Sequence, residues 1–503
     1  MKKAAVMLAG LLATMAVALC GCAGDKAEET SLGQITIGIP QDLEDGLDPH
    51  KVSAAGTKEI LFNIYEGLVK YDAKGDLQPA LASEFQVSED GKEYSFTLRE
   101  GVKFHNGKEM TAEDVIWSIN RCGGAEGEAL VPAFSNINSI TNQDNKVVKI
   151  GLKTPDSEFL ASMTTAILPA DSIDPAKEVV GTGPYRFVSR TPQESIILQA
   201  FDDYWGEKAH IKDVTLKVVA NPDTIVMELK GGSIDMFCRI TDTQAAELAG
   251  TDFNVLEGTM NLVQALYLNN SVEPFTDKRV RQALCYAIDP QEIMDFVSGG
   301  KGTEVGSSMF PAFKKYYDES LNHTYDRDIE KAKSLLAEAG YPDGFTFTMT
   351  VPSNYQQHIS TAEVLKEQFA AIGVNAEISL IEWDSWVSDV YVGRDFTSTV
   401  VGVDASPLTA RALLERFTSD YGKNFINFNS AEYDAAFAAA IGTTDDAEQT
   451  AHYEDCLRIL SEDAANVYIQ DLPTFVALRN NITGYEFYPL YVQDIAALRF
   501  VTE

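Results

Sequence analysis

Patterns typical of strands and helices alternate in two separate stretches of this chain, and this alternation restricts its fold more than any other feature. In the first stretch, strand patterns follow one another over 185–220, before a segment at 222–236. In the second stretch, strand patterns at 345–352 and 374–383 flank a helical pattern at 360–373. Repeated alternation of this kind predicts two α/β lobes.

Length and composition agree with this prediction. The chain has 503 residues, whereas a single hydrophobic core stops growing at roughly 250–300 residues. Its hydrophobic content of 45% and charged content of 23% are typical of a soluble globular protein. The net charge of −35 argues against nucleic acid as a partner, because nucleic acid requires a basic surface. It also argues against docking on an anionic membrane through surface charge.

The N-terminus has the form of a lipoprotein signal peptide. Two lysines precede an apolar run at 4–19 that is shorter than the roughly 20 residues of a membrane-spanning helix. Cys22 follows the small residue Gly21, as in the bacterial pattern for a lipidated cysteine. We therefore expect a signal peptide at 1–21, a lipid on Cys22, and a polar tether at 22–33. The protein would then be anchored in the cell membrane, on its extracytoplasmic face.

Four further cysteines are scattered along the chain without any C-x-x-C spacing: Cys122, Cys238, Cys285 and Cys456. This excludes the common zinc-ribbon and redox spacings. An extracellular location permits disulfides, but the sequence leaves open whether these cysteines pair or stay free and buried.

The stretch 101–118 concentrates residues that resemble a metal or acid/base site: His105, Glu109, Glu113 and Asp114. Each has a structural explanation as well. Asn106-Gly107 is a strong turn signal, and Thr111 with Asp114 forms a capping-box pattern for a following helix. We therefore predict that this stretch forms a turn and a helix cap rather than a metal or catalytic site.

An enzyme anchored at the cell surface, such as a hydrolase, is one functional class to consider, but the common catalytic motifs are missing from the sequence. There is no G-x-S-x-G, H-E-x-x-H, Walker A or EF-hand pattern, and the six histidines are scattered singly. We therefore expect no enzyme, no cofactor and no metal site.

Seven segments resemble, in the same order, the peptide/nickel family of extracellular solute-binding proteins, which is family 5 of the proteins that deliver ligands to ABC importers. They are 64–72, 79–121, 181–187, 204–219, 229–236, 269–289 and 325–345. This resemblance implies an α/β, two-lobed periplasmic-binding-protein type II fold with an extra domain inserted in the first lobe. The implied bounds are 34–262 for lobe I with the insert at about 65–178, 263–472 for lobe II, and 473–503 for a C-terminal return to lobe I.

The resemblance also implies a function. A monomer would capture small peptides in an interlobe cleft and deliver them to the permease subunits of an ABC transporter. The alternatives are another solute, such as a nickel chelate, haem or an oligosaccharide, or a peptide-sensing lipoprotein without transport.

Ligand-contacting residues follow from the same resemblance. Asp404 matches the acid that anchors the peptide ammonium in the family, although Asp-x-x-Pro is also turn chemistry. A tryptophan usually lies near that acid, whereas this chain has Gly402 and Val403. In the first lobe, the small residues that match the ligand-contacting segment are Ser53, Ala54 and Ala55.

Three more positions complete the candidate site. Trp383 matches an aromatic that lines a side-chain pocket, although Trp383 and Trp386 have a spacing that would also place both in a core. The arginine that binds the ligand carboxylate in dipeptide binders is missing, and Arg411 is the candidate to replace it. His358, in the same region, is a single histidine and does not predict a metal site.

Overall fold

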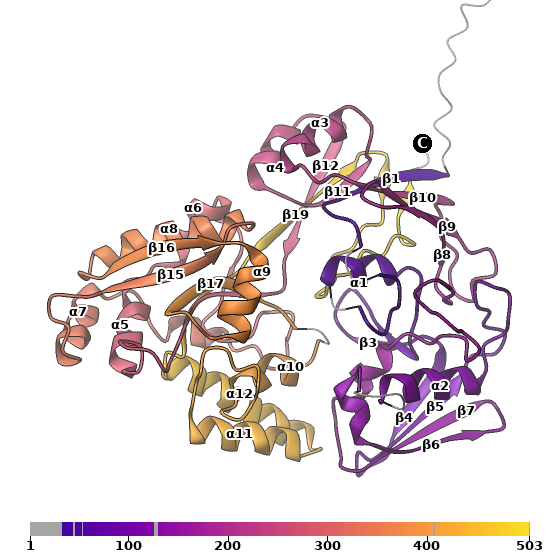
Figure 1. Ribbon diagram of the computed structural model, residues 1–503, viewed down its shortest axis with the longest axis horizontal. Helices are drawn as coiled ribbons and strands as arrows, with labels where there is room; N and C mark the ends of the chain where they lie inside the picture. Colours follow the sequence, from indigo (N-terminus) through magenta and orange to yellow (C-terminus); the bar gives the residue numbers. More distant parts are fainter. Residues whose placement is uncertain (1–32, 44–45, 53, 125–128, 406–407, 502–503) are drawn as a thin grey trace, which may run out of the picture.

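The computed structural model describes residues 33–43, 46–52, 54–124, 129–405 and 408–501. The predicted signal peptide, the lipidation candidate Cys22 and the ligand candidate Ser53 lie outside the described residues. The chain folds into two lobes, which lie on the right and left of Figure 1. No helix among the described residues is long and apolar enough to span a membrane.

The first lobe is built on a seven-stranded sheet with the order β12-β19-β11-β1-β10-β9-β8. Its strands are β1 (Gln34–Ile39), β8 (Tyr185–Thr191), β9 (Ser195–Ala200), β10 (Asp213–Val218), β11 (Met236–Ile240), β12 (Phe253–Thr259) and β19 (Pro473–Arg479). The parallel neighbours of β1 are β10 and β11. Its helices are α1 (Ala55–Leu61), α3 (Ile225–Lys230) and α4 (Asp242–Leu248). The small sheet of β20 (Ile482–Thr483) and β21 (Arg499–Phe500) follows near the C-terminus.

The second lobe is built on a six-stranded sheet with the order β14-β18-β13-β17-β15-β16. Its strands are β13 (Val263–Leu268), β14 (Thr303–Glu304), β15 (Thr346–Pro352), β16 (Asn375–Ile381), β17 (Ser398–Val403) and β18 (Asn466–Asp471). Its helices are α5 (Lys278–Ala287), α6 (Pro290–Ser298), α7 (Ile329–Glu338), α8 (Gln356–Ala370), α9 (Trp383–Ser385), α10 (Ala410–Leu414), α11 (Ala431–Gly442) and α12 (Asp446–Glu462). A π-helical segment, Trp386–Val392, follows α9.

Strand β13 shows why this sheet lies between two cores. All of its residues are buried, and side chains alternate between the faces of a strand. Val263 and Tyr267 belong to one hydrophobic cluster, while Leu266 and Leu268 belong to another. A continuous apolar run is therefore what a central strand covered on both faces requires.

A further four-stranded sheet, in the order β4-β5-β7-β6, has a hydrophobic core of its own. Its elements are β4 (Ala82–Val87), β5 (Glu93–Leu98), α2 (Ala112–Cys122), β6 (Ile137–Gln143) and β7 (Val147–Leu152). This inserted domain follows the hairpin of β2 (Val69–Tyr71) and β3 (Leu77–Pro79). It lies between β1 and β8 in sequence and below the seven-stranded sheet in Figure 1. The predicted two-lobed α/β fold with an inserted domain is confirmed.

Within the described residues, the chain crosses between the two large sheets twice, from β12 to β13 and from β18 to β19. The crossings contact each other. The Met260 amide donates to the Leu472 carbonyl at 2.8 Å, and the Leu262 amide donates to Asp471 Oδ1 at 3.2 Å. These paired segments form the hinge between the lobes. Burial raises the pKa of Asp471 to about 7.

The four cysteines left open by the sequence are all free and buried: Cys122, Cys238, Cys285 and Cys456. Burial raises the pKa of each thiol to about 12. A reactive cysteine needs a lowered pKa and access to solvent. These four thiols have neither, so they serve as small core residues.

Candidate functional site

A cavity of about 1640 Å³ lies between the lobes. The first lobe and the inserted domain contribute most of its lining, including Ala55 and Tyr491. The second lobe contributes Asp404, Ala405, Thr409, Arg411, Ala412, Glu415 and Ile441. Since its walls come from both sides of the hinge, a change in the angle between the lobes opens or closes this cavity.

Asp404 lines the cavity just beyond the end of β17. Its carbonyl accepts a hydrogen bond from Arg416 Nη2 at 3.2 Å. Within the part of the chain that the structure describes, its carboxylate has no hydrogen-bond or ion-pair partner. A half-buried carboxylate of this kind favours a cationic ligand group, because desolvating a charge without a partner is costly.

Gly402 and Val403, the residues before Asp404, are strand residues of β17. Val403 is buried and pairs with Val263 of β13, and Gly402 pairs with Gln264. A Cβ on Gly402 would lie 2.8 Å from Leu262 Cδ1, at the first crossing between the lobes. Neither residue is part of the cavity lining, so they hold the strand that presents Asp404.

The candidates in the first lobe lie at the N-terminus of α1. Ala54 is the N-cap residue, and Ala55, the first residue of the helix, lines the cavity. Their small side chains leave the backbone of this segment close to the cavity.

The two tryptophans lie outside the cavity lining. Their rings stack at 5.0 Å between centroids, with an interplanar angle of 8°. Trp386 is buried in the core of the second lobe, and its Nε1 donates to Thr399 Oγ1 at 2.9 Å. Trp383 is partly exposed and packs edge-on against Tyr355. In this structure Trp386 is a core residue, which is the alternative that its three-residue spacing from Trp383 left open.

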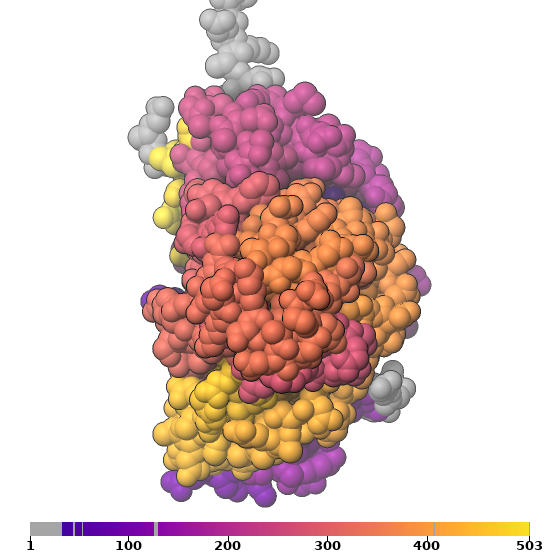
Figure 2. Space-filling view, turned by 90° about the vertical axis from the view of Figure 1, so that its left-hand side faces the viewer, coloured from indigo at the N-terminus to yellow at the C-terminus, as the bar shows by residue number. Residues whose placement is uncertain are grey.

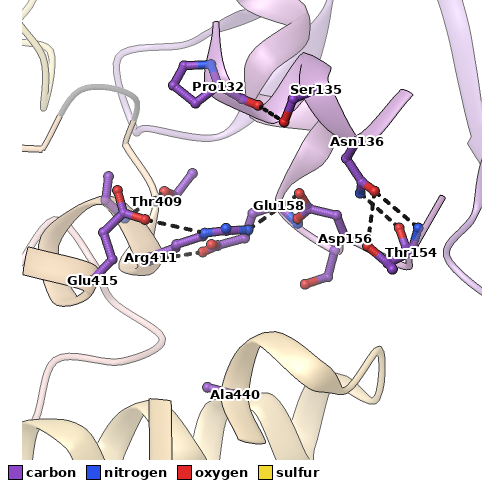
Figure 3. Close-up of polar contacts among 12 residues, drawn as sticks. Pro132, Ser135, Asn136, Thr154, Asp156, Glu158, Thr409, Arg411, Glu415 and Ala440 are labelled. Atoms are coloured by element: carbon purple, nitrogen blue, oxygen red, sulfur yellow. Dashed lines mark hydrogen bonds and ion pairs between the residues drawn. The ribbon is translucent and has the colours of Figure 1, made fainter. Parts of the chain in front are cut away.

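Arg411 lines the cavity, but two carboxylates already face its guanidinium (Figure 3). Nη1 lies 3.5 Å from Asp156 Oδ2 of the inserted domain, and Nε lies 3.5 Å from Glu415 Oε2. Its backbone amide also donates to Glu158 Oε1 at 3.4 Å. In this arrangement Arg411 joins the two lobes, and a ligand carboxylate would have to compete with both acids for it.

The loop that holds Asp156 and Glu158 makes further contacts with α12. Tyr453 Oη donates to Glu158 Oε2 at 3.2 Å, and Gln449 Nε2 donates to Ser157 Oγ at 2.6 Å. In Figure 2 the gold residues of α11 and α12 lie above the purple residues of the inserted domain. Burial, together with the nearby charge of Asp156, raises the pKa of Glu158 to about 7. The loop and its partners therefore form a second contact between the lobes, in addition to the hinge.

The histidines considered from the sequence have structural roles. Gln264 Nε2 lies 2.8 Å from His358 Nδ1 in the second lobe, and burial lowers the pKa of His358 to about 3. His105 Nε2 lies 3.0 Å from the Gly183 carbonyl, and burial lowers its pKa to about 4. Among the described residues, no group of three or more His, Cys, Asp or Glu side chains is placed to hold a metal ion.

The capping box predicted within 101–118 is present. Thr111 is the N-cap of α2, and its amide donates to Asp114 Oδ2 at 2.8 Å. Gly107 has a φ of +83°, as the predicted Asn-Gly turn requires. This stretch is local architecture of the inserted domain, as predicted.

Sequence reasoning missed Tyr491 and the loop at 155–158. Tyr491 lies in an irregular segment after β20, and its contacts are with residues far away in sequence. Asp156 and Glu158 are two acids among 75. No local pattern distinguishes these residues, because only the packing of the lobes brings them to the cavity.

Comparisons with known proteins identify the family of this chain. The profile of the bacterial extracellular solute-binding proteins, family 5, matches residues 76–425. The oligopeptide-binding protein AppA of Bacillus subtilis is 27% identical over 97% of both chains. The heme-binding protein A of Haemophilus influenzae is 29% identical over 84% of both.

A solved structure supports the same assignment. The dipeptide-binding protein of Pseudoalteromonas sp. SM9913, in complex with Met-Leu, is similar with a TM-score of 0.79 and 25% identity. The match covers 93% of this chain and all of that one. The predicted type II fold is thereby confirmed. With its two lobes, its interlobe cavity and its family profile, the chain belongs to the bacterial extracellular solute-binding proteins, family 5.

Proposed function

We propose that this protein is the extracytoplasmic ligand-binding lipoprotein of an ABC importer, which captures di- and oligopeptides and delivers them to the permease. The observation that carries the proposal is the Asp404 carboxylate, which lines the interlobe cavity without a cationic partner among the described residues. A free peptide amine supplies that partner. Reversible binding is sufficient for this role, and no covalent step is required.

The size of the cavity supports a ligand of several residues. Its volume of about 1640 Å³ exceeds the roughly 300–1,000 Å³ typical of pockets for drug-sized molecules. The relatives named for oligopeptides and dipeptides support the same class of ligand. Peptide backbone can hydrogen-bond to the exposed backbone of the protein, which gives affinity with little side-chain selectivity.

Haem is the second candidate ligand, because a relative named for heme binding is 29% identical to this chain. A nickel chelate, an oligosaccharide or a signalling peptide that is bound without transport would use the same cavity. Haem, a nickel chelate and an oligosaccharide differ from a peptide in what the protein retains during purification, whereas a sensor that binds peptide without transport is distinguished by the absence of neighbouring permease and ATPase genes.

The test is to purify the mature protein without denaturation and to identify the retained small molecules by mass spectrometry. Calorimetry with a mixed pool of di- to pentapeptides then measures binding directly. We expect peptides in the retained fraction and saturable binding from the pool. Recovery of haem, a metal chelate or a sugar, without binding from the pool, would contradict the proposal.

A further inference from the structure

Arg239 has an unusual backbone conformation for a strand residue. Its φ is +59°, in the left-handed region that residues other than glycine rarely adopt. It forms a bulge in β11, because Cys238 pairs with Val476 while Ile240 pairs with the adjacent Phe475. Strain of this kind persists only where the surrounding structure holds it, and it clusters at functional sites.

The Arg239 side chain holds helix α1. Its Nη1 and Nη2 donate to Glu59 Oε1 and Oε2 at 2.9 and 2.8 Å, which is a bidentate pair. Glu59 is buried, with 5% of its surface exposed. Two neighbours of Glu59 on α1, Ala55 and Lys58, line the cavity. The planar fork of an arginine fixes the orientation of its partner as well as its distance.

The same guanidinium also lies against Tyr491, with Cζ 5.7 Å from the ring centroid. Tyr491 lines the cavity from the first lobe. Asp404 of the opposite lobe lines the same cavity, and burial together with the charge of Asp404 raises the pKa of Tyr491. Arg239 thereby connects β11 to two separate segments of the cavity wall.

We propose that Arg239 is a positioning residue for ligand binding: its strained bulge orients a partly buried guanidinium that holds both α1 and Tyr491 at the cavity wall, across the cavity from Asp404. This inference rests on the proposed function of the cavity as the ligand site. Arg239 itself is not part of the cavity lining and acts through the residues that it holds.

The chain offers a matched control in the same lobe. Arg190 of β8 makes an equivalent, partly buried pair, with Nε and Nη2 donating to the two oxygens of Asp42 at 2.9 and 2.7 Å. The exposed fractions of the arginine side chains are similar, at 28% for Arg239 and 25% for Arg190. Neither Arg190 nor Asp42 lines the cavity. Removal of this pair tests the cost of losing a buried ion pair without disturbing the cavity wall.

The experiment compares the double variants Arg239→Met/Glu59→Gln and Arg190→Met/Asp42→Asn, in which no partner is left as a buried unpaired charge. Both are expected to lower the urea midpoint of unfolding to a similar extent. Only Arg239→Met/Glu59→Gln is expected to weaken binding of the mixed di- to pentapeptide pool, by about tenfold or more. The variant Arg239→Lys keeps the charge beside Glu59 but loses the fork, so we expect an intermediate affinity.

Amide hydrogen exchange gives a readout that needs no ligand. Residues 54–62 and the segment around Tyr491 are expected to exchange faster in Arg239→Met/Glu59→Gln, and to exchange as in the wild type in Arg190→Met/Asp42→Asn. Unchanged exchange in these segments, or equal affinities for the two double variants, would overturn the inference. A wild-type protein that binds no peptide would contradict the proposed function instead, while the exchange result would still decide the role of Arg239.

Discussion

Asp404 is the residue on which the proposed ligand chemistry depends most directly. We expect Asp404→Ala to cost about 1–3 kcal/mol of binding free energy for peptides with a free amine, because the bound ammonium would lose its charged partner. Isothermal titration calorimetry measures this cost. N-acetylated peptides serve as the control, since they carry no ammonium and should bind the two proteins equally. An equal loss for acetylated and free peptides would show that Asp404 acts in another way.

The raised pKa of Glu158 predicts that the contact between the lobes depends on pH. In the present arrangement burial raises its pKa from 4.5 to about 7, and opening at the hinge would expose it and restore the lower value. The closed arrangement therefore binds more protons than the open one. Its extra stability is fully present below about pH 4.5 and is lost as the pH rises through about 7.

The measurement is peptide affinity across this pH range in the wild type and in Glu158→Gln. The glutamine does not titrate. Its carbonyl oxygen can accept from the Arg411 amide, and its NH2 group can donate to the Tyr453 hydroxyl oxygen. The other charged groups facing Glu158, Asp156 and Arg411, are the same in both proteins. We expect Glu158→Gln to bind with a flatter pH profile, and identical profiles for the two proteins would refute the assignment.

The candidate site shows which residues could be predicted from the sequence. Asp404 and Ala55 were candidates because of the family resemblance, and both line the cavity. Trp386 was a candidate only through its position three residues after Trp383, and it lies in the core, because that spacing fits a buried helical face equally well. Tyr491 and Glu158 had no local signal, since their positions depend on packing between distant segments.

At the scale of elements, the contact between β17 and the first crossing is tight enough to test. A Cβ at Gly402 would lie 2.8 Å from Leu262 Cδ1, and Leu262 is buried. We expect Gly402→Ala to lower the free energy of unfolding by about 1–3 kcal/mol, because this space is already filled. Urea unfolding monitored by circular dichroism measures the change.

A double-mutant cycle shows whether Leu262 is the cause. Leu262→Ala alone is expected to cost about 2–5 kcal/mol. If the two side chains compete for the same space, the double variant Gly402→Ala/Leu262→Ala should cost less than the sum of the single variants. Additive costs would mean that the Gly402→Ala effect has another origin.

Element types were predictable where local patterns are strong. The alternation at 345–383 corresponds to β15, α8 and β16, and the capping box at Thr111 marks the start of α2. Strand pairing was not predictable from residues alone. For example, β19 lies between β11 and β12, and nothing within 473–479 indicates those partners. The residue bounds assigned to the lobes and the insert stay predictions.

For the whole molecule, membrane attachment should depend on a single residue. We expect Cys22→Ser to move the protein from the membrane fraction to the soluble fraction, because the acyl chains would have no attachment site. Fractionation followed by immunoblotting measures the distribution. Cys20→Ser is the matched control and should stay with the membrane. Continued membrane association of Cys22→Ser would show that the lipidation site was assigned incorrectly.

The position of β19 also determines the order in which the molecule can be assembled during translation. Among the described strands, β12 pairs only with β19, and β19 is made after the whole second lobe. A nascent chain that ends before Pro473 therefore lacks the strand that attaches β12 to the rest of its sheet. Closure of this long loop makes folding slow. The seven-stranded sheet is therefore completed only after the second lobe has been synthesised, although β11, β1, β10, β9 and β8 pair with one another without β19.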